Sequence, residues 1–157
     1  MLACVKTPIG FLEIFFDQSF AVKKISLVRP KEIFIPIAAS EFIEQLIAYF
    51  EGKLLEFNYP INIQGLSNFD KKVLDLTRKI PYGHTVTYKL MAEKINTSPR
   101  AIGQALRRNP IPIIIPCHRV IKSDGTQGGY SLGIEVKKWL IEHERSVSLV
   151  KSYQEML

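Results

Sequence analysis

The sequence predicts an α/β protein of the α+β type, in which a small antiparallel sheet with one helix precedes a mainly helical part. Two observations predict this architecture. Short segments rich in β-branched and aromatic residues open the chain, and capped helical patterns follow after residue 66. The 157 residues are 46% apolar and 23% charged, as is typical of a folded globular chain. No apolar run approaches the length of a bilayer span and no signal-peptide pattern opens the chain, so we expect neither a membrane segment nor secretion.

The first domain is expected over residues 1–62. Segments 2–7, 11–16 and 20–28 alternate with turn-forming residues at 7–10 and 17–19, a pattern that predicts the strands of a small antiparallel sheet. Residues 40–51 carry apolar side chains at helical spacing, and Gly52 is the expected stop. The expected buried face of this helix consists of Phe42, Ile43, Leu46, Ile47 and Phe50. Residues 58–65, which include a proline, are interpreted as a linker.

The second domain is expected over residues 63–157 and begins with three helices. Ser67 is a good N-cap for the first, Thr87 for the second, and Ser98 followed by Pro99 for the third. The second and third helices, joined by a brief turn, are typical of a helix-turn-helix in a winged-helix-like domain. The alternative is a plain helical hairpin whose arginines point into water.

A proline-framed loop over residues 110–121 follows the three helices, and it is expected to be rigid and largely buried. A last helix is expected over residues 134–144. The tail after Arg145 is weakly patterned and is interpreted as a short helix or a frayed end.

The charge of the chain is uneven. Residues 1–62 carry 6 Lys+Arg and 7 Asp+Glu, a net of −1, whereas residues 63–157 carry 15 and 8, a net of +7. A basic half indicates a polyanionic partner, with nucleic acid the first candidate and a generally basic surface the alternative. The two cysteines exclude a disulfide scaffold and fit a reducing cytosol, so a cytoplasmic location is expected.

Cys117 is the candidate for chemistry because His118 and Arg119 follow it directly in the proline-framed loop. A thiol attacks as its thiolate, and a neighbouring histidine or cation is expected to lower its pKa. The alternative is an inert buried cysteine. The cysteines and the three histidines show no zinc-type spacing, so no metal site is expected.

The run Ile115-Pro116-Cys117-His118-Arg119-Val120 resembles the signature of the O6-alkylguanine-DNA alkyltransferases, the methylated-DNA–protein-cysteine methyltransferases. Further motifs of this family occur in the same order and at similar spacing across residues 66–145. They are Phe69, Val73, Ile80-Pro81-Tyr82-Gly83, Thr87-Tyr88, Arg100-Ala101-Ile102-Gly103, Asn109-Pro110, Gly129-Tyr130-Ser131, Lys137, Leu140 and Glu144. Residues 1–62 match only in general character, as the variable N-terminal domain of the family.

The resemblance implies a role for each catalytic candidate. Cys117 would accept the alkyl group, His118 would act as base through a water, and Glu144 would orient the imidazole. Tyr88 would assist near the leaving guanine. The remaining candidates would build the base pocket and its frame: Tyr130 and Ser131 as lining, the backbone at Val120 as a reader of the base edge, and Asn109 as a tie between the helix-turn-helix and the active-site loop.

The resemblance also implies the partner, which is double-stranded DNA that carries O6-alkylguanine, with O4-alkylthymine as a second substrate. The base would be flipped out from the minor groove while Arg100 fills the gap in the stack. Ala101 and Gly103 would permit close approach to the DNA, and Arg107 would contact phosphates. The protein would act once, without a cofactor, as a monomer.

Two other functions stay open at this point. A non-catalytic module that binds alkylated DNA would not need Cys117 in an intact motif. A Cys–His hydrolase would not need the basic half or Arg100. If the resemblance holds, Leu132 occupies the position after Tyr130-Ser131 where the family usually has glycine. We therefore expect its side chain to crowd the part of the base pocket that would hold a large O6 substituent.

Overall fold

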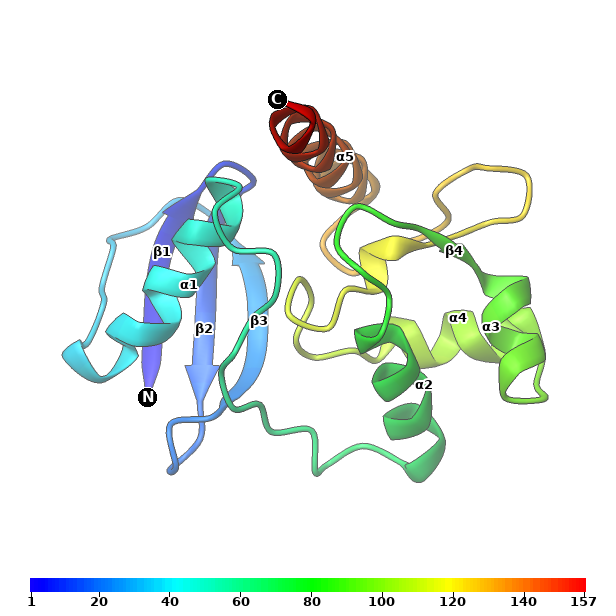
Figure 1. Ribbon diagram of the computed structural model, residues 1–157. Helices are drawn as coiled ribbons and strands as arrows, with labels where there is room; N and C mark the ends of the chain where they lie inside the picture. The colour runs from blue at the N-terminus through cyan, green and yellow to red at the C-terminus, as the bar shows by residue number, and fades with distance from the viewer. The chain divides into compact units, whose positions relative to one another are not determined.

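The computed structural model describes all 157 residues, which form two compact units, Met1–Gln64 and Gly65–Leu157. Each unit has its own elements and its own core (Figure 1). The predicted α/β fold class is confirmed, because a three-stranded antiparallel sheet with a helix is followed by a mainly helical unit. No helix is both long and apolar enough to cross a bilayer.

The first unit is a meander of three strands, β1 (Leu2–Thr7), β2 (Gly10–Phe16) and β3 (Val22–Val28), in the order β1-β2-β3. On β2 the side chains of Leu12, Ile14 and Phe16 alternate inward and are buried. The third strand starts at Val22, two residues later than expected. The Asp17 carboxylate accepts from the backbone of Ser19 and Ala21 and so holds residues 17–21 in a turn.

One helix, α1 (Ser40–Phe50), follows a single 3₁₀ turn, η1 (Ile37–Ala39), and contributes four of the five side chains expected on its buried face. Ile47 is the exception and is exposed, whereas Tyr49 is fully buried. Tyr49 turns inward because it packs against two aromatic rings, Phe50 at 5.3 Å and Phe57 at 5.5 Å between centroids.

The expected linker is partly wrong, because its first half belongs to the first unit. The Pro60 carbonyl accepts from Val22 N at 3.0 Å, and Asn62 N donates to the Val22 carbonyl at 2.8 Å. Residues 60–62 therefore add one bridge to the edge of β3, which covers part of an otherwise open strand edge.

The second unit opens with α2 (Asn68–Arg78), α3 (Tyr88–Lys94) and α4 (Pro99–Arg107). Each helix starts at the predicted cap, since Ser67, Thr87 and Ser98 accept from the backbone N–H three residues on. The helices α3 and α4 pack on each other across a short turn, as a helix-turn-helix requires. The residues that follow, 111–120, are buried without exception.

A short parallel pairing of two strands positions the loop that carries Cys117. Val86–Thr87 (β4) pairs with Val120–Ile121 (β5), directly after the 3₁₀ turn Cys117–Arg119 (η2). Because α3 begins at the end of β4, this pairing brings the first residue of α3, Tyr88, beside the loop of Cys117.

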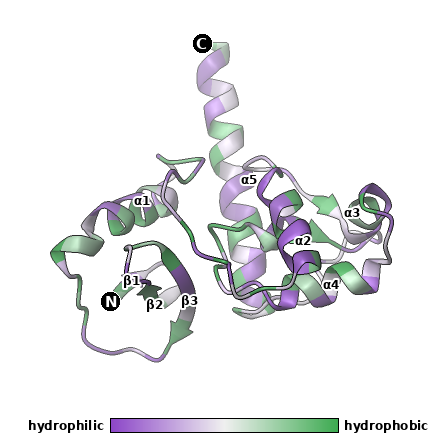
Figure 2. Cartoon of the chain, turned by 90° about the horizontal axis from the view of Figure 1, so that it is seen from below, coloured by the Kyte–Doolittle hydropathy of each residue, from purple (hydrophilic) through white to green (hydrophobic).

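The last helix, α5 (Ile134–Met156), is longer than expected, because the tail after Arg145 continues it without a break. Only its first half contributes to the core, through Lys137, Leu140, Ile141 and Glu144. Its residues alternate between hydrophilic and hydrophobic along the whole length, so no single stripe marks it as a core helix (Figure 2). This explains why periodicity did not predict its end.

Candidate active site

Cys117 is the first residue of η2, and its side chain is almost fully buried. Its Sγ accepts from Asn109 Nδ2 at 3.2 Å. The same amide donates to the Ile115 carbonyl at 3.0 Å and accepts from Ile111 N at 2.9 Å. Asn109 therefore fixes the thiol and the loop that carries it from the end of α4.

The thiol is not activated in the resting structure. Burial raises the pKa of Cys117 to about 11, and this outweighs the Asn109 hydrogen bond and the charge of Lys137, which act the other way. The expectation that its neighbour lowers this pKa is wrong, because His118 directs its hydrogen bond to another residue. The thiol therefore rests in its neutral form.

His118 is fully buried and pairs with Glu144 of α5, with 2.7 Å between Nε2 and Oε2. Burial lowers the pKa of His118, and hydrogen bonds from its partners hold the pKa of Glu144 well below its ordinary value despite burial. An ionised carboxylate requires the hydrogen on Nε2, so Nδ1 carries the lone pair. Nδ1 is buried and has no hydrogen-bond partner in the protein.

Two further residues, Arg119 and Gly83, hold Glu144, and the sequence predicted neither of these contacts. Arg119 donates to both carboxylate oxygens, at 2.8 and 3.0 Å, and Gly83 N donates at 3.2 Å. Gly83 has φ +78°, and a Cβ at this position would lie 2.1 Å from Ser148 Oγ. Only glycine permits this close approach of the chain to α5.

Lys137 is the third residue without a predicted role, although it was part of the matched motif set. Its buried Nζ donates to the carbonyls of Val120, at 2.7 Å, Gly129, at 3.1 Å, and Gln127. Burial lowers the pKa of Lys137 to about 8. Lys137 therefore joins the segment after Cys117 to the glycine-rich loop. The sequence does contain a signal for Lys137, because this lysine lies at helical spacing from the apolar residues Leu140 and Ile141, on the face that is buried.

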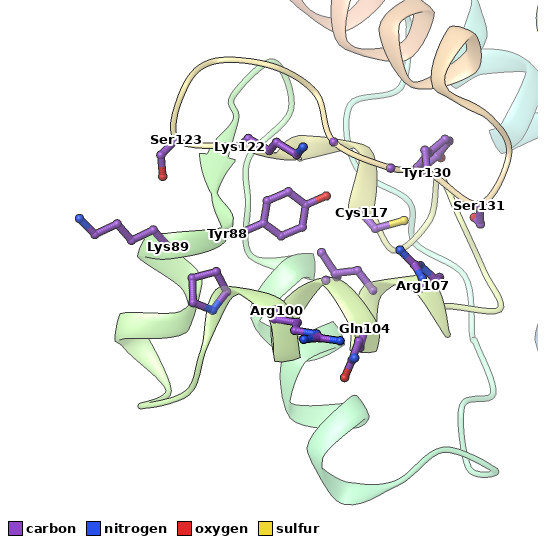
Figure 3. Close-up of a pocket in the computed structure, with 15 residues that line it drawn as sticks. Tyr88, Lys89, Arg100, Gln104, Arg107, Cys117, Lys122, Ser123, Tyr130 and Ser131 are labelled. Atoms are coloured by element: carbon purple, nitrogen blue, oxygen red, sulfur yellow. The ribbon is translucent and has the colours of Figure 1, made fainter.

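Tyr88 lies beneath this loop, 3.4 Å from Lys137 Nζ, and its hydroxyl is directed toward the Cys117 sulfur (Figure 3). Burial raises the pKa of Tyr88, so the phenol keeps its proton at neutral pH. Gly128, at φ +74°, passes so close that a Cβ would lie 2.9 Å from the Tyr88 hydroxyl.

A pocket of about 870 Å³ opens onto Cys117. Cationic side chains of α4, Arg100 and Arg107, form one wall, and Lys89, Lys122 and Ser123 lie on the other side (Figure 3). The other predicted residues that line it are Tyr88, Gly103, Tyr130 and Ser131.

Some residues that were expected close to the DNA or the flipped base do not line this pocket. Ala101 is half-buried on α4, Val120 is fully buried with its carbonyl engaged by Lys137, and Leu132 lies outside the lining. The expectation that Leu132 crowds the pocket therefore has no support in the structure. No three His, Cys, Asp or Glu side chains lie close enough together to share a metal ion.

Comparison with known proteins identifies the second unit and the chain as a whole. Residues 68–146 match the family model described as 6-O-methylguanine DNA methyltransferase, DNA binding domain. A methylated-DNA–protein-cysteine methyltransferase of Saccharolobus islandicus is 48% identical over 105 residues, which cover 67% of this chain and 68% of the relative. One from Methanocaldococcus jannaschii is 56% identical over 77 residues, 49% of this chain and 46% of the relative.

Solved structures match this chain over nearly its full length. Mycobacterium tuberculosis OGT in complex with DNA has a TM-score of 0.84 at 34% identity and covers 93% of both chains. The O6-methylguanine-DNA methyltransferase of Pyrococcus kodakaraensis has a TM-score of 0.69 at 29% identity and covers 92% of this chain and 99% of its own. The match of the second unit to the family model and the identity with these relatives show that the chain belongs to the family of methylated-DNA–protein-cysteine methyltransferases.

Proposed function

We propose that Cys117 accepts the alkyl group from O6-alkylguanine, and from O4-alkylthymine, in double-stranded DNA. The observation that carries this proposal is the pairing of His118 with Glu144 next to a buried thiol that opens into a basic pocket. The chemistry is a direct repair in which the protein acts once. The cytoplasm is the proposed location, since both cysteines are free thiols.

The reaction begins with loss of the thiol proton. His118 Nδ1 is the acceptor, through a bridging water, because Nε2 already donates to Glu144. The imidazolium that forms is stabilised by the Glu144 carboxylate. Since the thiol has a pKa of about 11, the thiolate forms within the occupied site rather than in the resting protein.

The thiolate then displaces the base. A sulfur lone pair forms the S–C bond to the alkyl carbon, the C–O6 bond breaks, and its electron pair stays on guanine. Tyr88 donates a hydrogen bond to the leaving base. The base takes up one proton and His118 gives up the one that it received from Cys117, so the imidazole is neutral again at the end. The sum is a thiol and an alkylated base converted to a thioether and guanine, so no cofactor is required. A thioether has no proton to lose, and the protein cannot react again.

The target base must leave the duplex to reach the buried thiol. The protein acts as a monomer and approaches the DNA from the minor groove. Arg100 then fills the space that the flipped base leaves in the stack, while Tyr130 and Ser131 hold that base in the pocket. Gly103 permits the approach of α4 to the DNA, and Arg107 contacts phosphate. Arg100 and Arg107 both line the pocket, which supports this arrangement.

Incubation of the protein with duplex DNA that carries methyl-labelled O6-methylguanine tests the proposal. We expect one label per protein, located on Cys117 by mass spectrometry, and none in Cys117→Ala. Binding of the lesion without transfer would favour a non-catalytic DNA-binding module instead. Transfer that survives Cys117→Ala would overturn the assignment of the acceptor.

A further inference from the structure

Arg119 binds the Glu144 carboxylate through two hydrogen bonds. The guanidinium bridges both oxygens, with Nε 2.8 Å from Oε1 and Nη2 3.0 Å from Oε2. Its remaining nitrogen, Nη1, donates to the Ile80 carbonyl at 2.7 Å. The carboxylate is therefore fixed in one orientation between α5 and the residues that follow α2, and its Oε2 faces His118 Nε2.

The charges in this buried cluster cancel only because Arg119 is present. A carboxylate beside a neutral imidazole carries one net negative charge, and burial of that charge favours uptake of a proton by the pair. The guanidinium supplies the opposite charge, so the cluster of Arg119, Glu144 and His118 is neutral without an extra proton. A histidine that already holds an extra proton cannot accept one from Cys117.

The other charged or titratable groups around His118 do not replace Arg119. Lys137 of α5 acts in the same direction on the pKa of His118, but its hydrogen bonds go to the loop carbonyls of Val120 and Gly129. Tyr130 lies 6.3 Å from the imidazole between ring centroids, and burial keeps its phenol neutral. Tyr82 packs against the guanidinium at 5.6 Å and is also neutral, and Cys117 rests as a thiol.

We propose that Arg119 is a positioning residue for alkyl transfer, which fixes the Glu144 carboxylate and cancels its charge so that His118 rests as a neutral base. This role rests on the proposed function of Cys117. Arg119 does not line the pocket, and it acts through the orientation and the proton balance of the His118–Glu144 pair.

The test is the single-turnover transfer rate from pH 5 to 9 with saturating duplex DNA that carries O6-methylguanine. In Arg119→Met the pair is left with a net negative charge and takes up its proton at higher pH. The acidic limb, the pH range in which the rate rises as the base loses its proton, is expected to move to higher pH by at least about one unit. At pH values below this range the variant is then roughly tenfold slower than the wild type. A limb that coincides with that of the wild type would overturn the proposal.

Arg108→Met is the matched control, because Arg108 also binds a carboxylate through two nitrogens, at 2.7 and 2.8 Å from Asp70. The acidic limb of Arg108→Met is expected to stay in place. An equal shift would mean that loss of any arginine–carboxylate pair suffices, and it would overturn the role of Arg119. If Arg119→Met does not fold, Arg119→Lys decides the question. It keeps the charge but cannot bridge both oxygens, so the rate falls at every pH while the limb stays, and a wild-type rate overturns the positioning role.

A second measurement does not depend on alkyl transfer. Nitrogen-15 NMR of the imidazole, with His84 and His143 replaced by glutamine, follows the protonation of His118 directly. We expect a neutral ring with hydrogen on Nε2 at pH 6 in the wild type and an imidazolium in Arg119→Met. Identical titrations would overturn the role of Arg119. If the wild type transfers no label to Cys117, the proposed function fails, and this titration still decides what Arg119 does.

Discussion

Glu144 connects chemistry and stability in a single side chain, since it is almost fully buried and accepts from His118, Arg119 and Gly83. Glu144→Gln keeps the shape but removes the charge that supports the imidazolium. We expect slower transfer by a substantial part of the roughly 10²–10⁴-fold that a positioned base contributes, with little change in DNA affinity. An unchanged rate would remove Glu144 from the relay.

The same substitution leaves the Arg119 guanidinium buried without its counter-charge, a situation that typically costs about 3–5 kcal/mol. Stability and rate are therefore measured together, by denaturant unfolding and by single-turnover transfer. In the double variant Arg119→Met/Glu144→Gln, neither member of this ion pair is left buried without the other. We expect this variant to regain stability but not activity, which separates the two roles of the carboxylate.

Gly83 is the residue whose requirement for glycine is best defined by the structure. Gly83→Ala puts a side chain at φ +78° and 2.1 Å from Ser148 Oγ, so we expect a loss on the order of 2–4 kcal/mol. Gly125→Ala is the matched control, because Gly125 has φ +86° but nothing within 4 Å of the added Cβ. Thermal or denaturant unfolding measures both. Equal losses would show that backbone strain alone matters and that contact with α5 does not.

The helix α4 presents two arginines to the pocket, and their positions predict different tasks. Arg100 lies in the first turn of α4 and Arg107 in the last, two turns further on. Arg100→Ala is expected to slow repair of duplex DNA much more than reaction with the free modified base, because only the duplex needs a flipped nucleotide. Arg107→Ala is expected to weaken duplex binding with little effect on the rate at saturating DNA. Equal losses on both substrates for Arg100→Ala would count against insertion into the stack.

How far the elements could be predicted depends on where their signals lie. Caps are local, and Ser67, Thr87 and Ser98 each start the helix that they predicted. Burial depends on tertiary neighbours. For this reason Ile47, which was expected on the buried face of α1, is exposed, and Tyr49, which was not assigned to that face, is buried. The end of α5 could not be predicted, since its exposed second half carries no core periodicity.

The catalytic candidates also divide into those with a local sequence signal and those that depend on contacts between distant residues. The cysteine–histidine motif is contiguous, so Cys117 and His118 could be named from sequence. The contacts of Arg119 and Gly83 with Glu144 span 25 and 61 residues, and no spacing rule connects them. The raised pKa of Cys117 was equally hidden, because it follows from burial of the loop and not from the neighbouring residue types.

At the scale of the molecule, the buried His118–Glu144 pair makes the stability of the second unit depend on pH. His118 has a folded-state pKa below its ordinary 6.5, and Glu144 has one well below its ordinary 4.5. Both groups bind their protons more readily when unfolded. The stability that they contribute is present above those ordinary values and is lost as pH falls through them, His118 first and Glu144 next.

We therefore expect the free energy of unfolding to decrease from about pH 6.5 downward, by at most about 1.4 kcal/mol per pH unit for each proton taken up. The only tryptophan, Trp139, lies on α5, so its fluorescence follows the second unit during denaturant unfolding at each pH. His118→Gln removes the first titrating group and should flatten the curve between pH 6.5 and 5 while leaving the steeper fall below pH 4.5. A wild-type stability that stays constant from pH 7 to 5 would mean that folding leaves the pKa of His118 unchanged, and a stability that rises as pH falls would mean that the folded protein holds this proton more tightly; either result contradicts the lowered pKa of His118.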